Sequence, residues 1–311
     1  MKVIAKDTHK MSREEWLQLR AKSGLGGSDI SAVFGCNKNK SIFQLWQEKT
    51  GQVEPKEEEN EYTHFGNVLE PIVKQEFTRR TGLKVRAKNM LLQNEDYPWL
   101  TANLDGVVND DGELCVFEAK TASEYKKNDW AKGVPFNYVL QCQSYLLTTG
   151  YKRAYIAAII GGNSFKVWVI ERDEAIMKQI IQKTEVFWKN HVLTGIPPIA
   201  DGSPATTEFI NNEYKVSNGK AIELPPEALQ LIERYDDISA QITKLNENKD
   251  KITNELKLFM MDNDEGYVSN RKVSWKNVNS TYFDKKCLQN DYPDIYNEYV
   301  VEKNYRRFMV A

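Results

Sequence analysis

The stretch LDGVVNDDGELCVFEAK, which spans residues 104–120, decides the fold expected for this chain. It overlaps two short runs of strand-forming residues, 102–108 and 113–120, which are separated by the turn-forming sequence NDDG at residues 109–112. This order predicts a β-hairpin. Because residues 115–117 are apolar, we expect the second strand to lie centrally in a sheet and to be half buried.

Three polar residues stand out on this hairpin. Glu118 and Lys120 are two positions apart, so both side chains point to one face of the strand, and the hairpin can bring Asp105 alongside them. Carboxylates and a lysine are costly to bury unless they serve each other or a metal, and carboxylate oxygens suit Mg²⁺ or Mn²⁺. A lysine here can act on a water molecule or stabilise charge on a phosphate. A surface hairpin with a Glu118–Lys120 ion pair is the alternative interpretation.

Two further polar features flank the hairpin. We expect Glu70 near the start of a helix over residues 67–81, and Gln141 and Gln143 on a helix that Pro135 opens. As ordinary features, Glu70 would be an acidic residue favoured by the helix macrodipole, and the two glutamines would lie on a solvated face. Their functional interest comes from their positions in the chain, on either side of the hairpin.

The order of the elements predicts an α/β protein in two parts. Helices, a hairpin, a helix, further strands and a long helix follow one another within residues 1–200, which indicates a core with a central mixed β-sheet flanked by helices. Residues 201–222 are polar and rich in turn formers, so we expect a linker there. Residues 223–311 then form a C-terminal extension with one long helix and a small α+β part.

The long helix of the extension carries a heptad seam. Its apolar members follow alternating steps of four and three, with Lys249 interrupting one position. They are Leu231, Tyr235, Ile238, Ile242, Leu245, Ile252, Leu256 and Phe259. We expect the seam to pack within the extension, against residues 267–310. The alternative is a coiled coil between chains, with Lys249 setting the register.

Composition excludes several classes of protein. The 311 residues include 42 basic and 44 acidic side chains, so any nucleic-acid-binding surface must be local. Four scattered cysteines, without a Cys-x-x-Cys pair, argue against zinc-ribbon and iron–sulfur sites and against a disulfide framework. No apolar run approaches the about 18 residues of a membrane span. The N-terminus has no apolar segment typical of a secretory signal, so we expect a cytoplasmic protein.

The motifs together resemble a known family. Trp16-x-x-x-Arg20 and the sequence GGSD at residues 26–29 precede the residues already described. In this order and spacing, the set resembles the lambda-exonuclease branch of the PD-(D/E)XK nucleases, often labelled YqaJ-type viral recombinases. The resemblance covers about residues 12–195 and implies a phage or prophage origin.

The resemblance implies a restriction-endonuclease-like core with two Mg²⁺ or Mn²⁺ ions per active site. Asp105, Glu118 and the main-chain carbonyl of Ala119 would bind metal, and Lys120 would act on the attacking water. Glu70 would support the second ion or the water, and Gln143 would position the water or Lys120.

The resemblance also implies how DNA is held. Arg20 and Ser28 match positions that grip the 5′-phosphate of a DNA end, and both residue types suit phosphate. An Arg near a helix end and a Ser at a helix N-cap are the ordinary alternatives.

The implied activity is a metal-dependent 5′→3′ exonuclease on linear double-stranded DNA. It would leave 3′ single-stranded tails for recombination by single-strand annealing. The resemblance further implies a homotrimeric ring that threads DNA, and a partner single-strand annealing protein in the bacterial host cytoplasm. An end- or structure-specific endonuclease with the same core, and a non-catalytic DNA-binding recombination scaffold, are the competing hypotheses.

Overall fold

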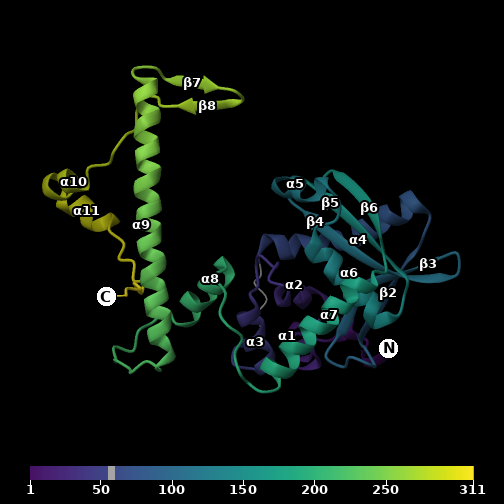
Figure 1. Cartoon of the computed structure of the whole chain (residues 1–311). Coiled ribbons are helices and arrows are strands. Elements are labelled where there is room, and N and C mark those ends of the chain that lie inside the picture. The colour runs from purple at the N-terminus through teal and green to yellow at the C-terminus, as the bar shows by residue number, and fades with distance from the viewer. Residues whose placement is uncertain (55–59, 311) are drawn as a thin grey trace. The chain divides into compact units, whose positions relative to one another are not determined.

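The computed structural model describes residues 1–54 and 60–310 (Figure 1). The stretch at residues 54–61 is acidic, contains Pro55 and has no apolar residue, which is typical of a solvated loop, and it falls largely outside the described residues. The chain divides into two compact units, Met1–Glu213 and Tyr214–Ala311. Among the helices of the described ranges, none combines the length and the apolar character that a membrane span needs.

A six-stranded mixed sheet forms the centre of the first unit. Its strands are consecutive in space: β1 (Lys2–Lys6), β2 (Val85–Gln93), β3 (Thr101–Asp110), β4 (Glu113–Ala122), β5 (Arg153–Ile160) and β6 (Ser164–Glu171). All neighbours are antiparallel except β4 and β5, which are parallel. The predicted α/β class with a central mixed sheet is thus confirmed, as is the predicted hairpin, β3–β4. A second hairpin joins β5 to β6.

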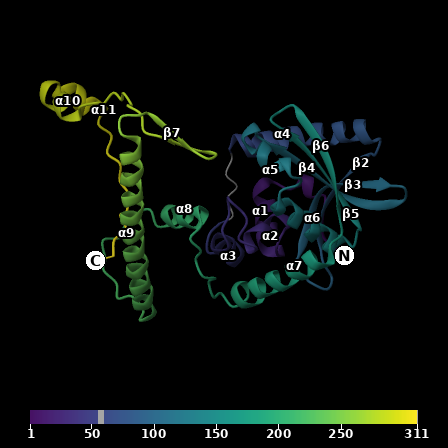
Figure 2. The same cartoon turned by 45° about the horizontal axis from the view of Figure 1, so that its top comes forward.

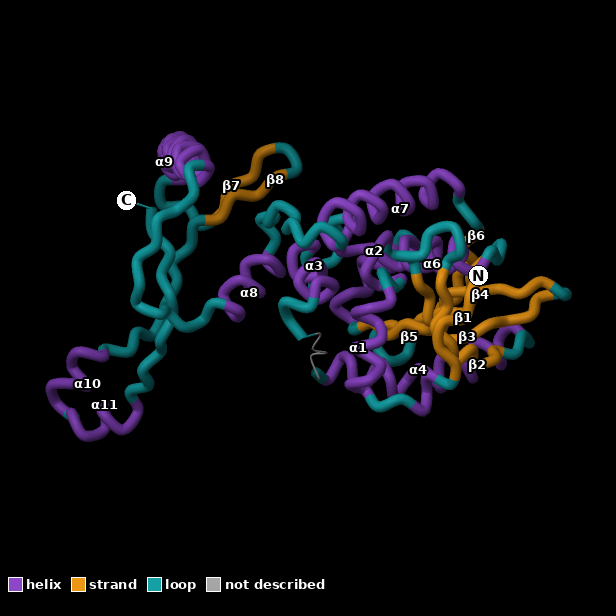
Figure 3. Tube along the Cα trace, turned by 90° about the horizontal axis from the view of Figure 1, so that it is seen from below, coloured by secondary structure: helices purple, strands orange, loops and turns teal. Residues whose placement is uncertain are grey.

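Helices cover both faces of the sheet. Figures 2 and 3 show α4 (Glu61–Thr81) on one side of the strands, and α6 (Phe136–Thr149) with α7 (Glu174–Phe187) on the other. On β4, Phe117 packs against Phe77 of α4, whereas Val116 packs in the cluster that contains Leu146 of α6. The alternation of a strand therefore directs residue 118, like residue 116, toward the α6 side.

The parallel step between β4 and β5 needs a crossover connection. This connection contains a short 3₁₀ helix at Glu124–Lys126, helix α5 (Lys127–Ala131) and helix α6. Helix α6 follows Pro135 and ends at Gly150, whose φ of 76° lies in the left-handed region that terminates helices. The crossover lays α6 across the sheet next to β4, and this places Gln141 of α6 beside Glu118 of the hairpin.

Helix α4 begins earlier than the sequence pattern predicts. Asn60 accepts a hydrogen bond from the main-chain N–H of Thr63, whose hydroxyl accepts one in return from the N–H of Asn60, so a capping box starts the helix there. Glu70 therefore lies in the middle of a 21-residue helix, and the prediction that it stands near a helix start is wrong. The macrodipole cannot explain a carboxylate at that distance from the terminus.

The remaining helices of the first unit lie near the N-terminus and after β6. They are a 3₁₀ helix at Thr8–Lys10, α1 (Arg13–Ser23), α2 (Gly27–Val33), α3 (Ile42–Thr50), a π-helical turn at Trp188–Val192 and α8 (Pro204–Glu213). Helix α1 begins with a capping box, formed by Ser12 and Glu15, the residue spacing typical of this motif. Helix α8 lies inside the stretch for which a linker is predicted, and its Ala205 and Thr206 are buried.

The second unit is built around α9 (Glu227–Met260), which confirms the predicted long helix. It also contains the hairpin β7 (Glu265–Val268) and β8 (Arg271–Ser274), and the helices α10 (Lys285–Asp291) and α11 (Pro293–Tyr299). Residues 307–310, whose sequence RFMV favours a short strand, adopt irregular backbone instead.

The heptad seam of α9 is not covered by the rest of its unit. Its eight apolar side chains remain 41% to 84% exposed, although the ring of Phe308 approaches that of Tyr235 at 6.4 Å between centroids. The prediction that residues 267–310 form the other wall of the seam is therefore wrong. Those residues form a short hairpin, two short helices and irregular backbone, and among the described residues they leave the seam open.

Candidate active site

The two predicted carboxylates and the lysine meet on the β3–β4 hairpin. The pairing of Gly106 with Phe117 makes Asp105 and Glu118 cross-strand neighbours. Lys120 Nζ lies 2.6 Å from Glu118 Oε1, and Asp105 Oδ2 accepts a hydrogen bond of 2.8 Å from the N–H of Ala119. Glu118 is 2% exposed, so this is a buried polar cluster and not the surface ion pair of the alternative interpretation.

Gly106 makes this close arrangement possible. A Cβ atom at this position would lie 2.5 Å from Val85 Cγ1 and 3.1 Å from the carbonyl oxygen of Arg86, both on β2. The sequence Asp105-Gly106 therefore combines a functional carboxylate with the one residue type that lets β2 approach β3 beside it.

Burial and like charge disturb the ionisation of the cluster. Burial, together with the negative charge of Asp105, raises the pKa of Glu118 to about 8. Burial also raises the pKa of Asp105, with a smaller contribution from Glu70 and an opposing one from Lys120. Burial alone would lower the pKa of Lys120, but the charges of Glu118 and Asp105 outweigh it and raise the pKa, so Lys120 stays protonated at neutral pH.

The donor set of this cluster fits a divalent cation. Glu118 Oε2 is buried and has no hydrogen-bond partner among the described residues, while Asp105 stands beside it. Burying a carboxylate oxygen without a partner costs free energy, and a second carboxylate of raised pKa beside it adds to this cost. A bound cation would remove both contributions. The described residues contain no group of three or more His, Cys, Asp or Glu side chains that could hold a metal. A cation here would thus take its remaining ligands from the main chain, solvent or substrate, as Mg²⁺ commonly does.

The two glutamines of α6 have different surroundings. Gln141 Nε2 donates to Glu118 Oε1 at 2.7 Å and to the hydroxyl of Tyr145 at 3.0 Å. Gln143 instead donates to the carbonyl of Glu171 and accepts from the N–H of Asp173, so it joins α6 to the connection between β6 and α7.

The predicted placement of Gln143 at the reacting groups is therefore wrong. Residues two apart on a helix point about 200° apart around its axis, so only one of the pair can face the carboxylates. Gln141 takes that place. The spacing of four between Gln141 and Tyr145, which sets two side chains on one helix face, is the signal that could have identified it.

Glu70 of α4 also belongs to the surroundings of the cluster. It forms a short ion pair with Lys74 one turn later, and its negative charge raises the pKa of both Asp105 and Glu118. The structure thus brings Glu70 within electrostatic range of the carboxylates, from a different element of the fold.

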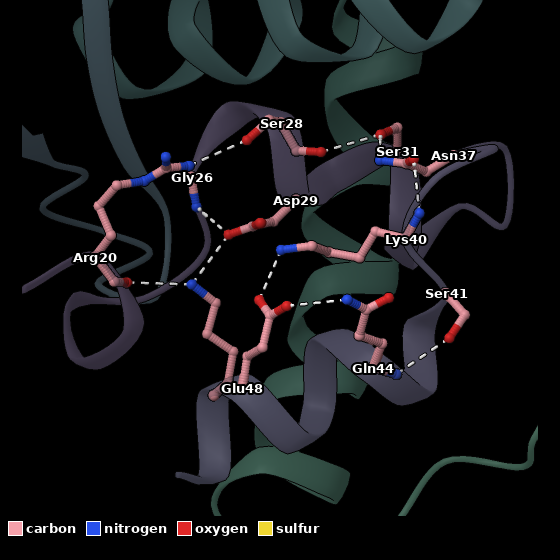
Figure 4. Close-up of polar contacts among 11 residues, drawn as sticks. Arg20, Gly26, Ser28, Asp29, Ser31, Asn37, Lys40, Ser41, Gln44 and Glu48 are labelled. Atoms are coloured by element: carbon pink, nitrogen blue, oxygen red, sulfur yellow. Dashed lines mark hydrogen bonds and ion pairs between the residues drawn. The ribbon is translucent and has the colours of Figure 1, made fainter. Parts of the chain in front are cut away.

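The two residues expected to bind a 5′-phosphate lie together. Arg20 of α1 donates from Nη2 to Ser28 Oγ of α2 at 3.1 Å (Figure 4). The N-terminus of α2 touches the helix that carries Gln141, because a Cβ on Gly27 would lie 2.5 Å from the ring of Tyr145. Arg20 also contributes to the electrostatics of Tyr145, as do Glu118 and Asp105. The pair therefore adjoins the carboxylate cluster through Tyr145.

A buried ion pair lies beside Arg20 and Ser28, and the sequence pattern does not predict it. Asp29 of α2 and Lys49 of α3 pair at 3.0 Å, with side chains only 5% exposed (Figure 4). Burial alone would raise the pKa of Asp29, but the charges of Lys49, Lys40 and Arg20 hold it well below its usual range. Lys49 is separated from Asp29 by a loop and a helix, and no sequence pattern connects the two.

Comparisons with known proteins agree on one family. A family model described as the YqaJ-like viral recombinase domain matches residues 15–152, a range that includes every predicted site residue. The protein YqaJ of Bacillus subtilis (strain 168) is 39% identical over 310 residues, which are 98% of this chain and 96% of that protein.

Two solved structures are also similar. The alkaline exonuclease LHK-Exo from Laribacter hongkongensis is 20% identical, with 64% of this chain and 97% of that chain covered and a TM-score of 0.49. A phage-related exonuclease from Haemophilus somnus 129PT is 13% identical, with 61% and 96% covered and a TM-score of 0.41.

We predict that the metal-free protein becomes less stable as pH rises toward about 8. The folded chain keeps the proton of Glu118 until about pH 8, whereas the unfolded chain releases it near the ordinary glutamate pKa of about 4.3. Within this window the folded state binds more protons, so the free energy of unfolding falls with rising pH, by on the order of a few kcal/mol. Urea unfolding in EDTA at about pH 6 and about pH 9 measures the change.

Glu118→Gln is the matched control for this prediction, because it keeps the shape and removes the titrating group. Its free energy of unfolding should fall less between the two pH values than that of the natural protein. If the free energy of unfolding changed equally with pH in both proteins, the assignment of a raised pKa to Glu118 would be contradicted.

Proposed function

Because this chain belongs to the YqaJ-like viral recombinase family, we propose that it is a metal-dependent 5′→3′ exonuclease of linear double-stranded DNA. The product would be a duplex with 3′ single-stranded tails for recombination by single-strand annealing. The observation that carries the proposal is the cluster of Asp105, Glu118 and Lys120, in which a buried carboxylate oxygen of Glu118 has no hydrogen-bond partner among the described residues.

Asp105, Glu118 and the main-chain carbonyl of Ala119 would hold Mg²⁺ or Mn²⁺, with two ions per active site. When bound, the ions supply Lewis-acid stabilisation of the charge that develops on the phosphate and lower the pKa of the attacking water. The residues of this chain supply orientation. Gln141 and Lys120 both donate to Glu118 Oε1, which leaves Oε2 as the free ligand atom.

Lys120 acts in this proposal as a cation and hydrogen-bond donor. Its raised pKa keeps the ammonium protonated, and it lies 4.8 Å from the centroid of the Tyr138 ring, which limits where Nζ can point. It would therefore orient the attacking water and stabilise negative charge on the scissile phosphate, and it would not remove a proton. Glu70, whose charge already reaches the carboxylates, would support the second ion or the water.

The direction of digestion would come from the Arg20–Ser28 pair. A guanidinium and a hydroxyl 3.1 Å apart can both donate to a terminal 5′-phosphate, and Arg offers charge-assisted, bidentate contacts. Their contact with the carboxylate cluster through Tyr145 would set the terminal nucleotide beside the reacting groups.

The assembly and the partners are part of the same proposal. We propose that the chain works on double-stranded DNA in the cytoplasm of a bacterial host, as a homotrimeric ring. A single-strand annealing protein would receive the 3′ tail. Supporting these points is the family membership, and the relative from Bacillus subtilis covers nearly the whole chain.

One digestion experiment tests the proposed activity. A linear duplex labelled separately on each strand and a closed circular duplex are incubated with Mg²⁺ or with EDTA. We expect loss of 5′-terminal nucleotides from the linear duplex only, and only with Mg²⁺. Cleavage of the circle would indicate an endonuclease, and no cleavage of either substrate would indicate a DNA-binding scaffold.

We predict that Lys120→Ala and Asp105→Ala both lower the rate of cleavage by about 100-fold or more, for different reasons. Lys120→Ala removes the group that orients water, so binding of Mn²⁺, followed by calorimetry, should be largely retained. Asp105→Ala removes a metal ligand, so Mn²⁺ binding should weaken as well. Lys152→Ala, which breaks an exposed ion pair with Glu113, is the control and should cleave normally. Near-normal turnover by either active-site variant would remove the assignment.

We also predict that duplex with a 5′-phosphate is degraded faster than the same duplex with a 5′-hydroxyl, by roughly tenfold or more. A hydrogen bond to a charged group contributes roughly 1.5–3 kcal/mol, and Arg20→Ala should erase most of the difference. Arg79→Ala is the matched control, because Arg79 is exposed and pairs with Glu76 of its own helix. Equal rates on both ends with Arg20 intact would refute the phosphate site and leave the nuclease assignment standing.

A further inference from the structure

A single buried lysine connects the three helices around the proposed phosphate site. Lys49 of α3 pairs with Asp29 of α2 at 3.0 Å and donates to the main-chain carbonyl of Arg20 of α1 at 3.1 Å. Asp29 Oδ2 accepts in addition from the N–H of Gly26, at the entrance of α2 (Figure 4). Lys49 thereby holds both chain segments that carry the phosphate-binding pair.

Packing alone does not explain this arrangement. Taking two charges out of water is expensive, and apolar residues of similar volume often serve stability as well or better. The Lys49 side chain is 5% exposed and its charge is balanced by Asp29, so it is also unsuited to touch DNA directly. What the pair provides is a fixed geometry: the backbone of Arg20 and the loop before Ser28 are joined through one ammonium group.

We propose that Lys49 is the positioning residue of the DNA-end site, which holds Arg20 and Ser28 in the geometry that receives a 5′-phosphate. This inference rests on the proposed role of that pair. Through its hydrogen bond to the carbonyl of Arg20, Lys49 fixes the end of α1. Through Asp29 it fixes Gly26, and with it the start of α2. Arg20 and Ser28, the two hydrogen-bond donors to the phosphate, are then already oriented before DNA binds. Binding therefore costs little side-chain conformational entropy.

The test is binding of duplexes that differ only at the 5′ end, measured by fluorescence anisotropy in EDTA so that no cleavage occurs. Lys49→Met should lower the affinity for the 5′-phosphorylated duplex about tenfold and bring it close to that for the 5′-hydroxyl duplex. In an Arg20→Ala background most of the preference is already lost, so the same change should have little further effect on it, because Lys49 acts only by positioning Arg20 and Ser28. Lys49→Arg, which keeps the charge and the donors, should restore part of the preference.

A second variant covers the case in which Lys49→Met fails to fold. Asp29→Asn combined with Lys49→Met removes both charges and keeps an acceptor for the N–H of Gly26, so no unpaired buried charge remains. It should be folded and should still lose the preference. A folded variant that keeps the full preference, or full additivity with Arg20→Ala, overturns the role of Lys49. If the natural protein binds the 5′-phosphorylated and the 5′-hydroxyl duplex equally well, the phosphate site is refuted, and this inference with it. The digestion experiment described above then still decides separately whether the protein is an exonuclease.

The open seam of α9 carries a second, independent inference. At the interrupted position of the heptad, Lys249 would lie against its own copy in a parallel two-stranded coil, and two ammonium groups would repel each other. In an antiparallel coil Lys249 lies opposite Ile238 of the other chain instead. Its long apolar stem can then cover the seam while the charge reaches solvent.

Charge complementarity favours the same orientation. In the heptad register of the seam, Arg234 directly precedes the core residue Tyr235, and Glu255 directly precedes the core residue Leu256. Both therefore occupy position g of the heptad, and g positions of the two helices face each other in an antiparallel coil. With Ile242 opposite Leu245, the register sets Arg234 of each chain beside Glu255 of the other, twice by symmetry. A parallel coil would set Arg234 beside Ser239 and would form no such ion pair.

We propose that α9 pairs antiparallel with α9 of a second copy of this chain. The contact buries the seam that the described residues leave exposed. Because the pair has two-fold symmetry, it is separate from any contact that closes a three-fold ring. It can join two assemblies but cannot form one ring.

Cysteine cross-linking of the full chain tests this pairing, in a background where the exposed Cys287 is replaced by serine. Arg234→Cys and Glu255→Cys chains that carry different tags should form a mixed disulfide when combined and oxidised. Lys249→Cys chains alone should not cross-link. Self-cross-linking of Lys249→Cys would show a parallel coil and overturn the proposal. Failure of all cross-links would overturn it too, and would mean that another surface covers the seam.

Discussion

The candidate site of the first unit depends on the burial of polar groups along β4. Glu118 is almost fully buried, so its carboxyl group needs polar partners, and Lys120, two positions later, provides one without leaving the strand. The strand must then lie between a neighbour that brings Asp105 and a helix that brings Gln141. The hairpin and the crossover each deliver one polar partner to the same face of the sheet, since Asp105 comes with β3 and Gln141 with α6.

The parts that sequence could predict are those with short-range geometry. Asp105, Glu118 and Lys120 lie on one hairpin, so alternation along a strand is enough to place them together. The sequence motif contains both Gln141 and Gln143 and does not say which of them faces the carboxylates. The rotation of the helix between the two positions decides this, and it turns Gln143 toward Glu171 instead. Glu70 was placed wrongly in its helix because the capping box at Asn60 lies well upstream. The ion pair between Lys49 and Asp29 could not be predicted, because tertiary packing alone brings these two residues together.

Two groups of residues with different chemistry share one wall in this fold. The N-terminus of α2 rests on Tyr145, and Tyr145 accepts from the same Gln141 amide that binds Glu118. A glycine at position 27 permits this contact, since any side chain would separate α2 from α6. The spacing between the Arg20–Ser28 pair and the carboxylates is therefore set by rigid packing, which is what the proposed positioning of a DNA end requires.

The parallel join between β4 and β5 also bears on how the chain folds. The hairpins β3–β4 and β5–β6 connect residues close in sequence, whereas the parallel join must wait for the crossover to close a long loop. Pairings of high contact order form slowly, so we expect the two hairpins to precede it. Gln141 lies on that crossover, and the carboxylate cluster is complete only after the slow step. A nascent chain would then complete its carboxylate cluster only after both hairpins have formed.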